Sequence, residues 1–170
     1  PLLILSSHYK CVVANPPYMG QKSMNAELKN YVNEKYPLSK SDLMTVFMEV
    51  IPAKVFESGR FSFINLPSWL FLSSFESIRK LYIEKYTIES LLHMGRGIFG
   101  IDFGSVAITL KKGKSKLNTG NYFRLHERNF QHIQYNDIEK LFLYSKGNPL
   151  YKYDFSNYKS EAGNNDISMQ

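Results

Sequence analysis

Cysteine, an initiator methionine and long apolar runs are scarce or missing in this sequence. Its 170 residues contain a single cysteine, Cys11, which excludes an internal disulfide and a structural zinc site built on a cysteine cluster. Cys11 lies within an apolar run, so we expect a small buried side chain there. The first apolar run, residues 2–5, is too short for a signal peptide or a membrane span. These absences favour a reducing, cytoplasmic setting without a membrane partner.

Positive charge is in modest excess. Lysine and arginine number 21 against 15 acidic residues, which gives a net charge of +6 and a pI of about 9.3. This balance attracts polyanions without saying which one, and a generic basic protein explains it equally well. Hydrophobic residues at 44% and charged residues at 21% are typical of a folded domain. The twelve tyrosines and twelve phenylalanines supply core side chains and also flat rings on which bases can stack.

The hydrophobic pattern alternates between short apolar runs and helical spacing. Apolar runs predict strands over residues 11–14, 61–66, 88–94 and 105–110. Helices are predicted over residues 25–34, from Ser41 and Asp42, and from Ser74, with Pro52 kinking or ending the second helix and Gly59 stopping its continuation. Alternating strands and helices indicate an α/β fold with parallel strands and helical crossovers. The last two strands, joined by a loop without a helix, predict an antiparallel pair at the sheet edge.

The pattern weakens after residue 116. A strand is predicted over residues 121–125 and a short helix over 137–144. The tail over residues 156–170 is polar, and we expect it to be disordered.

The segment Asn15-Pro16-Pro17-Tyr18 is the clearest candidate for a functional site, because it directly follows a predicted buried strand. In an open α/β sheet, ligands bind at the carboxyl ends of strands. An exocyclic aromatic amine is a poor nucleophile, and two acceptors for its hydrogens favour its attacking form. The Asn15 amide oxygen and the Pro16 carbonyl supply two acceptors, and the prolines hold the backbone between them rigid.

Tyr18 adds a ring on which an extruded base can stack, since a base amine inside a duplex is out of reach without base flipping. Such stacking contributes roughly 1–3 kcal/mol per base. A plain Asn-Pro-Pro turn with an incidental tyrosine is the alternative interpretation. The strand before the segment and the α/β pattern after it favour the functional interpretation.

Several segments in order carry a family resemblance: VVANPPYMG, SKSDLMTVFMEV, FSFINLPSWLFLSSFESIRKLYIEKYTIESLLHMG and GIFGIDFGSVAITLKKGK. They resemble N6-adenine-specific DNA methyltransferases, first those of BREX-type phage-defence systems and then fused restriction–modification enzymes. The likeness covers residues 9–114. It implies a partial Rossmann-like class I methyltransferase sheet, with residues 1–116 as the C-terminal half of the catalytic domain. Residues 117–155 would then begin a connecting or target-recognition segment, ahead of the tail.

The resemblance also implies roles for single residues. It makes Asn15, Pro16, Pro17 and Tyr18 the catalytic motif, with Asn15 also at the cofactor. Phe99 matches an aromatic that packs against the flipped adenine, although a loop-anchoring core position explains Phe99 equally well.

Other positions of the family pattern have a weaker assignment. Phe47 matches a residue that touches the cofactor adenine, although a core helix position is the stronger interpretation. Pro67 and Trp69 belong to the family pattern and are interpreted as packing residues.

The cofactor implied by the resemblance is S-adenosyl-L-methionine, whose main binding loop we expect to be absent from this chain. Only ten residues precede the first predicted strand, and the glycines from Gly95 to Gly104 come too late for that loop. The first residue is proline, so we expect a fragment that lacks the N-terminal cofactor-binding half. The strand over residues 11–14 would then be an exposed apolar edge, and the isolated chain would be marginally stable or associate. The histidines His8, His93, His126 and His132 show no metal-binding spacing.

The resemblance implies methylation of adenine N6 in double-stranded DNA, carried out by a larger enzyme. The expected partners are DNA, the missing N-terminal half, a target-recognition domain and other defence-system subunits. Alternatives are an inactive truncated remnant, or methylation of protein glutamine, RNA guanine or cytosine N4.

Overall fold

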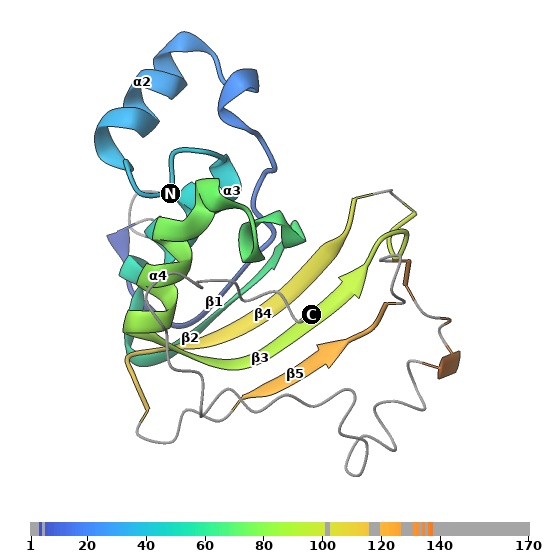
Figure 1. Cartoon of the computed structure of the whole chain (residues 1–170). Helices are drawn as coiled ribbons and strands as arrows, with labels where there is room; N and C mark the ends of the chain where they lie inside the picture. The colour runs from blue at the N-terminus through green and yellow to red at the C-terminus, as the bar shows by residue number, and fades with distance from the viewer. Residues whose placement is uncertain are drawn as a thin grey trace.

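A computed structural model describes residues 4, 6–100, 103–115, 120–126, 131–132, 134 and 136–137. Its core is a five-stranded sheet in the order β1-β2-β4-β3-β5 (Figure 1). The strands are β1 (Tyr9–Ala14), β2 (Val55–Asn65), β3 (Tyr86–Gly95), β4 (Ser105–Lys112) and β5 (Asn121–Arg124). The helices are α2 (Ala26–Lys35), α3 (Leu43–Val50) and α4 (Glu76–Lys85).

Four of these strands run in the same direction. β1 pairs in parallel with β2, and β3 pairs in parallel with β5, whereas β4 is antiparallel to both β2 and β3. The predicted mixed α/β fold and the antiparallel pairing of the last two predicted strands are confirmed. The predicted position at the sheet edge is wrong for β4, because β4 lies between β2 and β3. The loop from β3 turns back, so β4 fills the gap beside β2 and leaves the outer side of β3 to β5.

The main core lies on the sheet face that α3 and α4 cover (Figure 1). Phe61 and Phe63 of β2 alternate onto this face and are fully buried. Tyr82 of α4 stands edge-on to Phe61 at 6.1 Å and to Trp69 at 6.1 Å. Its hydroxyl donates to the Met48 carbonyl at 2.7 Å, which joins α4 to α3. Trp69 is thus a packing residue, as predicted.

Asp42 and Asn25 begin the predicted helices as caps. The Asn25 side chain accepts from the Leu28 N–H, and the Asp42 side chain accepts from the Met44 N–H. α3 ends at Val50, and a 3-10 turn containing Pro52 follows. Ser74, in contrast, is not a cap: it lies in a 3-10 turn, and α4 begins after Phe75 without a side-chain cap.

Gly59 lies inside β2, which begins six residues before the predicted strand. The register of β1 on β2 shifts here, from Tyr9 opposite Val55 to Cys11 opposite Arg60. A Cβ atom at Gly59 would stand 2.8 Å from the Lys10 carbonyl oxygen and 2.9 Å from that of Phe56. Gly59 therefore permits close backbone approach within the sheet instead of ending an element.

β1 is an edge strand of this sheet. Cys11 is exposed, which makes the prediction of a buried thiol wrong, and Val13 is 73% exposed. Both side chains lie on the sheet face opposite α3 and α4, because Val12 and Ala14 are the residues of β1 that pack on the core.

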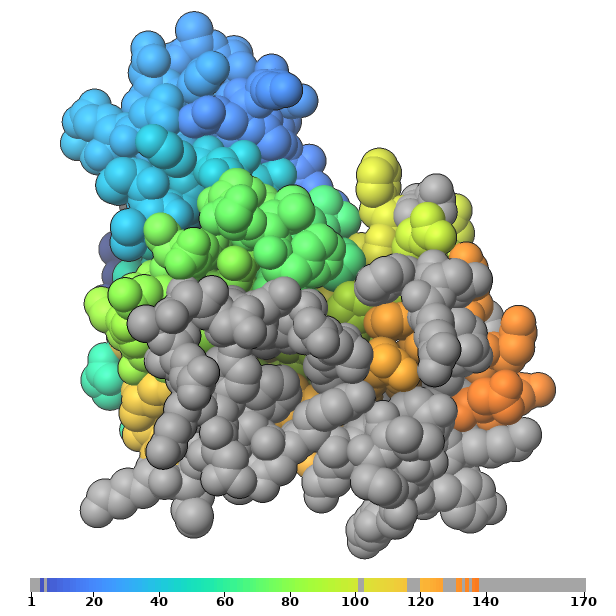
Figure 2. Space-filling view, viewed as in Figure 1, coloured from blue at the N-terminus to red at the C-terminus, as the bar shows by residue number. Residues whose placement is uncertain are grey.

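Residues 19–42 form a separate lobe around α2. Met24 and Val32 pack there against Val46 of α3 in a second, smaller hydrophobic cluster. The lobe (blue) and the tip of the β3–β4 loop (yellow) project from the same end of the molecule (Figure 2). The expected tail over residues 156–170, and the helix over 137–144 apart from its first residue, lie outside the described residues. No helix in the described part of the chain is long and apolar enough to cross a membrane.

Candidate functional site

The segment Asn15-Pro16-Pro17-Tyr18 leaves the carboxyl end of β1, as predicted. Ala14, the last residue of β1, pairs with Phe63 of β2, so the segment begins beside the end of β2. Pro16 is buried, whereas Asn15 and Tyr18 are exposed. A buried proline between them anchors the turn and presents the Asn15 side chain to solvent at the end of the sheet.

Tyr18 ties this turn to the neighbouring strand. Its hydroxyl lies 2.8 Å from the carbonyl oxygen of Ile64 in β2 and 3.1 Å from Oδ1 of Asn15, within donating distance of both. Burial raises the pKa of the Tyr18 hydroxyl, which keeps it protonated and able to donate at neutral pH. The ring remains 39% exposed. Tyr18 thus holds Asn15 in place and still offers an aromatic surface.

Asp42 fixes the other end of the loop that follows Tyr18. Its Oδ1 accepts from the Met19 N–H at 3.1 Å and from the Met44 N–H at 2.9 Å. The Leu43 N–H donates in turn to the Met19 carbonyl at 3.0 Å. One carboxylate therefore caps α3 and clamps the chain directly after the motif. The sequence indicated the cap, but it carried no signal for the contact with Met19.

The arrangement provides two hydrogen-bond acceptors at the sheet end. Oδ1 of Asn15 has two lone pairs, so contact with Tyr18 leaves it able to accept from a second donor. The Pro16 carbonyl is the other acceptor proposed from the sequence. Neither group is a base, so the site is suited to orienting an amine rather than to removing a proton from it.

Phe99 lies on the β3–β4 loop, at the same end of the sheet as the motif, because β1 and β3 run in the same direction. Its side chain is 56% exposed, which rules out the alternative of a core position that anchors the loop. Gly97 and Gly100 flank it with φ values of 84° and 71°, which side chains rarely adopt. The described contacts do not join Phe99 to Tyr18.

Phe47 is the exposed residue of α3. Its neighbours Met44 and Met48 are fully buried, whereas Phe47 is 39% exposed. The stronger interpretation from the sequence, which placed Phe47 in the core, is therefore wrong. The ring is accessible to a planar ligand.

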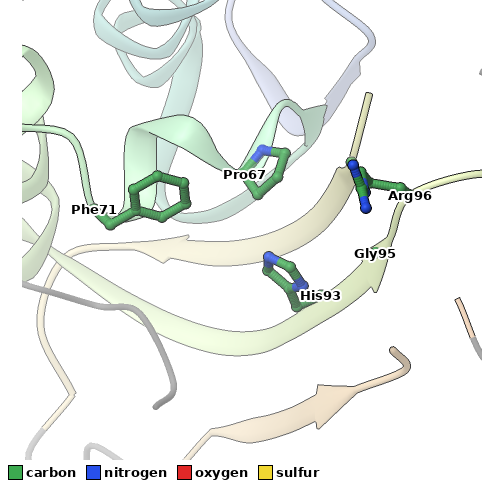
Figure 3. A pocket seen from close by; sticks show the side chains of 6 residues that line it. Pro67, Phe71, His93, Gly95 and Arg96 are labelled. Carbon is green, nitrogen blue, oxygen red and sulfur yellow. The ribbon is translucent and has the colours of Figure 1, made fainter. Parts of the chain in front are cut away.

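A pocket that sequence reasoning missed opens at the ends of β2 and β3 (Figure 3). It has a volume of about 290 Å³, and we call it the Phe71–Arg96 pocket. Phe71 and Arg96 stand at its opposite sides, with His93 between them (Figure 3). Its lining comes from three separate segments, so only tertiary structure assembles it. The lining residues are Pro67, Phe71, His93, Gly95, Arg96 and Gly104.

His93 is buried beside two other basic groups. Its pKa is lowered to about 4, chiefly by burial and additionally by the nearby positive groups His126 and Arg124. The His126 ring centroid is 4.3 Å from that of His93. His93 is therefore neutral at pH 7, and the Phe71–Arg96 pocket has an uncharged floor.

Buried polar atoms gather next to this pocket. Asn65 and His93 both pair with Val106 of β4, so the three side chains share one row and one face of the sheet. Both amide atoms of Asn65 and Nε1 of Trp69 are buried without a hydrogen-bond partner among the described residues. Among the same residues, no group of three or more His, Cys, Asp or Glu side chains could hold a metal ion.

Residues 4–99 match the model of a family described as Eco57I restriction-modification methylase. The chain is 37% identical over 142 residues to an adenine-specific methyltransferase, BrxX, of Escherichia coli O9:H4 (strain HS), covering 81% of this chain and 12% of that protein. It is 39% identical over 125 residues to an adenine-specific methyltransferase, PglX, of Lacticaseibacillus casei (strain Zhang), covering 71% of this chain and 10% of that protein.

The fold is similar to that of a type I restriction-modification system methyltransferase subunit from Streptococcus thermophilus. The TM-score is 0.57 at 17% identity, and the likeness covers 83% of this chain and 32% of that one. The chain thus spans a small part of the length of each of these relatives.

Proposed function

Because the chain belongs to the Eco57I restriction-modification methylase family, we propose that it is part of an enzyme that methylates N6 of adenine in double-stranded DNA. The observation that carries the proposal is Oδ1 of Asn15, held at the end of β1 by the Tyr18 hydroxyl, with the carbonyl of the next residue, Pro16, as the second acceptor. The expected setting is a restriction–modification or phage-defence system, with DNA and other subunits as partners.

S-adenosylmethionine would supply an electrophilic methyl group on a sulfonium centre when bound. The exposed ring of Phe47 fits contact with its adenine, and Asn15 follows the carboxyl end of β1. We propose that the chain offers these two contacts and that other parts of a larger enzyme supply the contacts with the methionine and ribose.

The residues of the motif orient the amine for reaction. Asn15 and the Pro16 carbonyl accept the two N6 hydrogens, which turns the nitrogen lone pair out of the ring plane. A bound S-adenosylmethionine would give up its methyl group to N6, and the proton that N6 loses would go to solvent, because neither Asn15 nor the Pro16 carbonyl is basic. The ring of Tyr18, with Phe99 as the second aromatic, holds the flipped base by stacking.

The test is transfer of tritiated methyl groups to unmethylated DNA, with digestion to identify the labelled base. We would compare the full product of the gene, this chain alone, and variants in the full product. Asn15→Ala should lower kcat by about 100-fold or more, because it removes one of two preorganised groups. The matched control is Asn30→Ala, an exposed asparagine on α2.

Label in N6-methyladenine that depends on Asn15 would support the proposal. Label in cytosine, RNA or protein, or label that survives Asn15→Ala unchanged, would contradict it.

A further inference from the structure

The Phe71–Arg96 pocket takes no part in the chemistry proposed for Asn15 and Tyr18. It opens at the same end of the sheet, but over β2, β4 and β3 rather than over β1. β2 and β4 separate β1 from β3, and neighbouring strands lie about 4.8 Å apart, so β1 and β3 are about 14 Å apart. An adenine ring held at Asn15 cannot also reach the pocket floor at His93. A group that reaches the pocket floor at His93 is therefore a different one from the adenine at Asn15.

The pocket suits a flat ring joined to an anion. A cavity of about 150 Å³ holds benzene, so a volume of about 290 Å³ accommodates a larger planar ring. Phe71 presents a ring that is 43% exposed at one side. Arg96, exposed at the other side, carries a positive charge, whereas the buried His93 is neutral at pH 7. A ring stacked on Phe71 would thus have a cation beside it.

We propose that the Phe71–Arg96 pocket binds a second nucleotide of the DNA strand, its base stacked on Phe71 and its phosphate at Arg96. The inference rests on the proposed function, which places DNA at this end of the sheet. A stacked strand rises about 3.4 Å per nucleotide, so about 14 Å corresponds to a nucleotide within about four positions of the methylated adenine. The pocket would then hold the strand while the adenine is flipped, and it would contribute to the choice of sequence.

The experiment uses the full product of the gene and unmethylated plasmid DNA. Equilibrium DNA binding is measured over a series of salt concentrations, together with the KM for DNA and the affinity for S-adenosylmethionine. The variants are Phe71→Ala, Phe71→Trp and Arg96→Gln. Phe56→Ala, an exposed phenylalanine near the start of β2, and Lys10→Gln, an exposed cation of β1, are the matched controls.

Phe71→Ala should weaken DNA binding about ten-fold without changing its salt dependence, because stacking releases no counterions. Phe71→Trp should restore binding, since a larger ring still stacks. Arg96→Gln should reduce the slope of log K against log salt by about one, as expected for one lost phosphate contact. Neither change should alter the affinity for S-adenosylmethionine.

The outcomes separate this inference from the proposed function. If Phe71→Ala and Arg96→Gln bind DNA as the two controls do, the inference is wrong, whether or not adenine is methylated. If they weaken binding as expected but the unaltered protein never labels adenine, the pocket binds DNA and the proposed function fails.

Discussion

At the scale of single residues, Tyr18 and Asp42 explain how an exposed turn is held rigid. Tyr18 joins the motif to the Ile64 carbonyl of β2, and Asp42 joins the residue after the motif to α3. These contacts join the turn to β2 through Ile64 and to α3 through Asp42. Asn15 itself is exposed, so its position depends on these neighbours rather than on burial.

His93 predicts a dependence of stability on pH. Its pKa is about 4 in the folded protein against an ordinary value of 6.5, so the unfolded chain binds more protons between these values. Stability contributed by neutral His93 is fully present above about pH 6.5 and is lost as the pH falls towards 4. From pH 7 to pH 5 the loss should be about 2 kcal/mol.

Urea unfolding at pH 7 and pH 5 checks this expectation. His93→Gln removes the titrating group, so the variant should lose about 2 kcal/mol less than the unaltered protein over that range. An equal pH dependence in both proteins would show that other groups, rather than His93 beside His126 and Arg124, control it.

At the scale of elements, the pairing of β1 with β2 depends on a close backbone approach at Gly59. Gly59→Ala would place a methyl group within 2.8 Å of the Lys10 carbonyl oxygen and 2.9 Å of the Phe56 carbonyl oxygen, and backbone atoms in a sheet cannot easily move away. We expect a loss of about 1–3 kcal/mol in unfolding free energy, measured by denaturant titration.

Gly20→Ala is the control for this change, because a Cβ atom at Gly20 would meet only Asp42 Oδ2, at 3.8 Å. The control should stay within about 0.5 kcal/mol of the unaltered protein. If the two variants were equally stable, the register shift beside Gly59 would be easily relaxed.

At the scale of the whole molecule, β1 is an edge strand with exposed apolar side chains, which favours contact with another chain. An edge strand with exposed apolar side chains is a template for pairing with another chain. We expect this chain by itself to associate through β1, so its sedimentation coefficient should rise with concentration. Val13→Lys, which places a charge at a residue that is 73% exposed, should reduce that association.

Phe56→Lys provides the comparison, since Phe56 is 52% exposed near the start of β2. A monomer at all concentrations, or an equal effect of both lysine variants, would contradict association through the β1 edge.

Local patterns in the sequence determined most of the elements and the position of the motif. Residues 9–14 and 43–50 have the apolar spacing of a strand and a helix, and Pro16, Asp42 and Pro52 mark their ends, because these signals act within a few residues of chain. The Asn15-Pro16-Pro17-Tyr18 turn was predictable for the same reason.

Tertiary structure alone decided the features that depend on strand order and register. The place of β4 between β2 and β3, the exposure of Cys11 and the role of Gly59 follow from pairings between residues far apart in the sequence. The Phe71–Arg96 pocket likewise joins the ends of β2 and β3 to the start of β4. The spacing of residues along the chain does not predict these features, because they arise only when the sheet brings segments together that are far apart in the sequence.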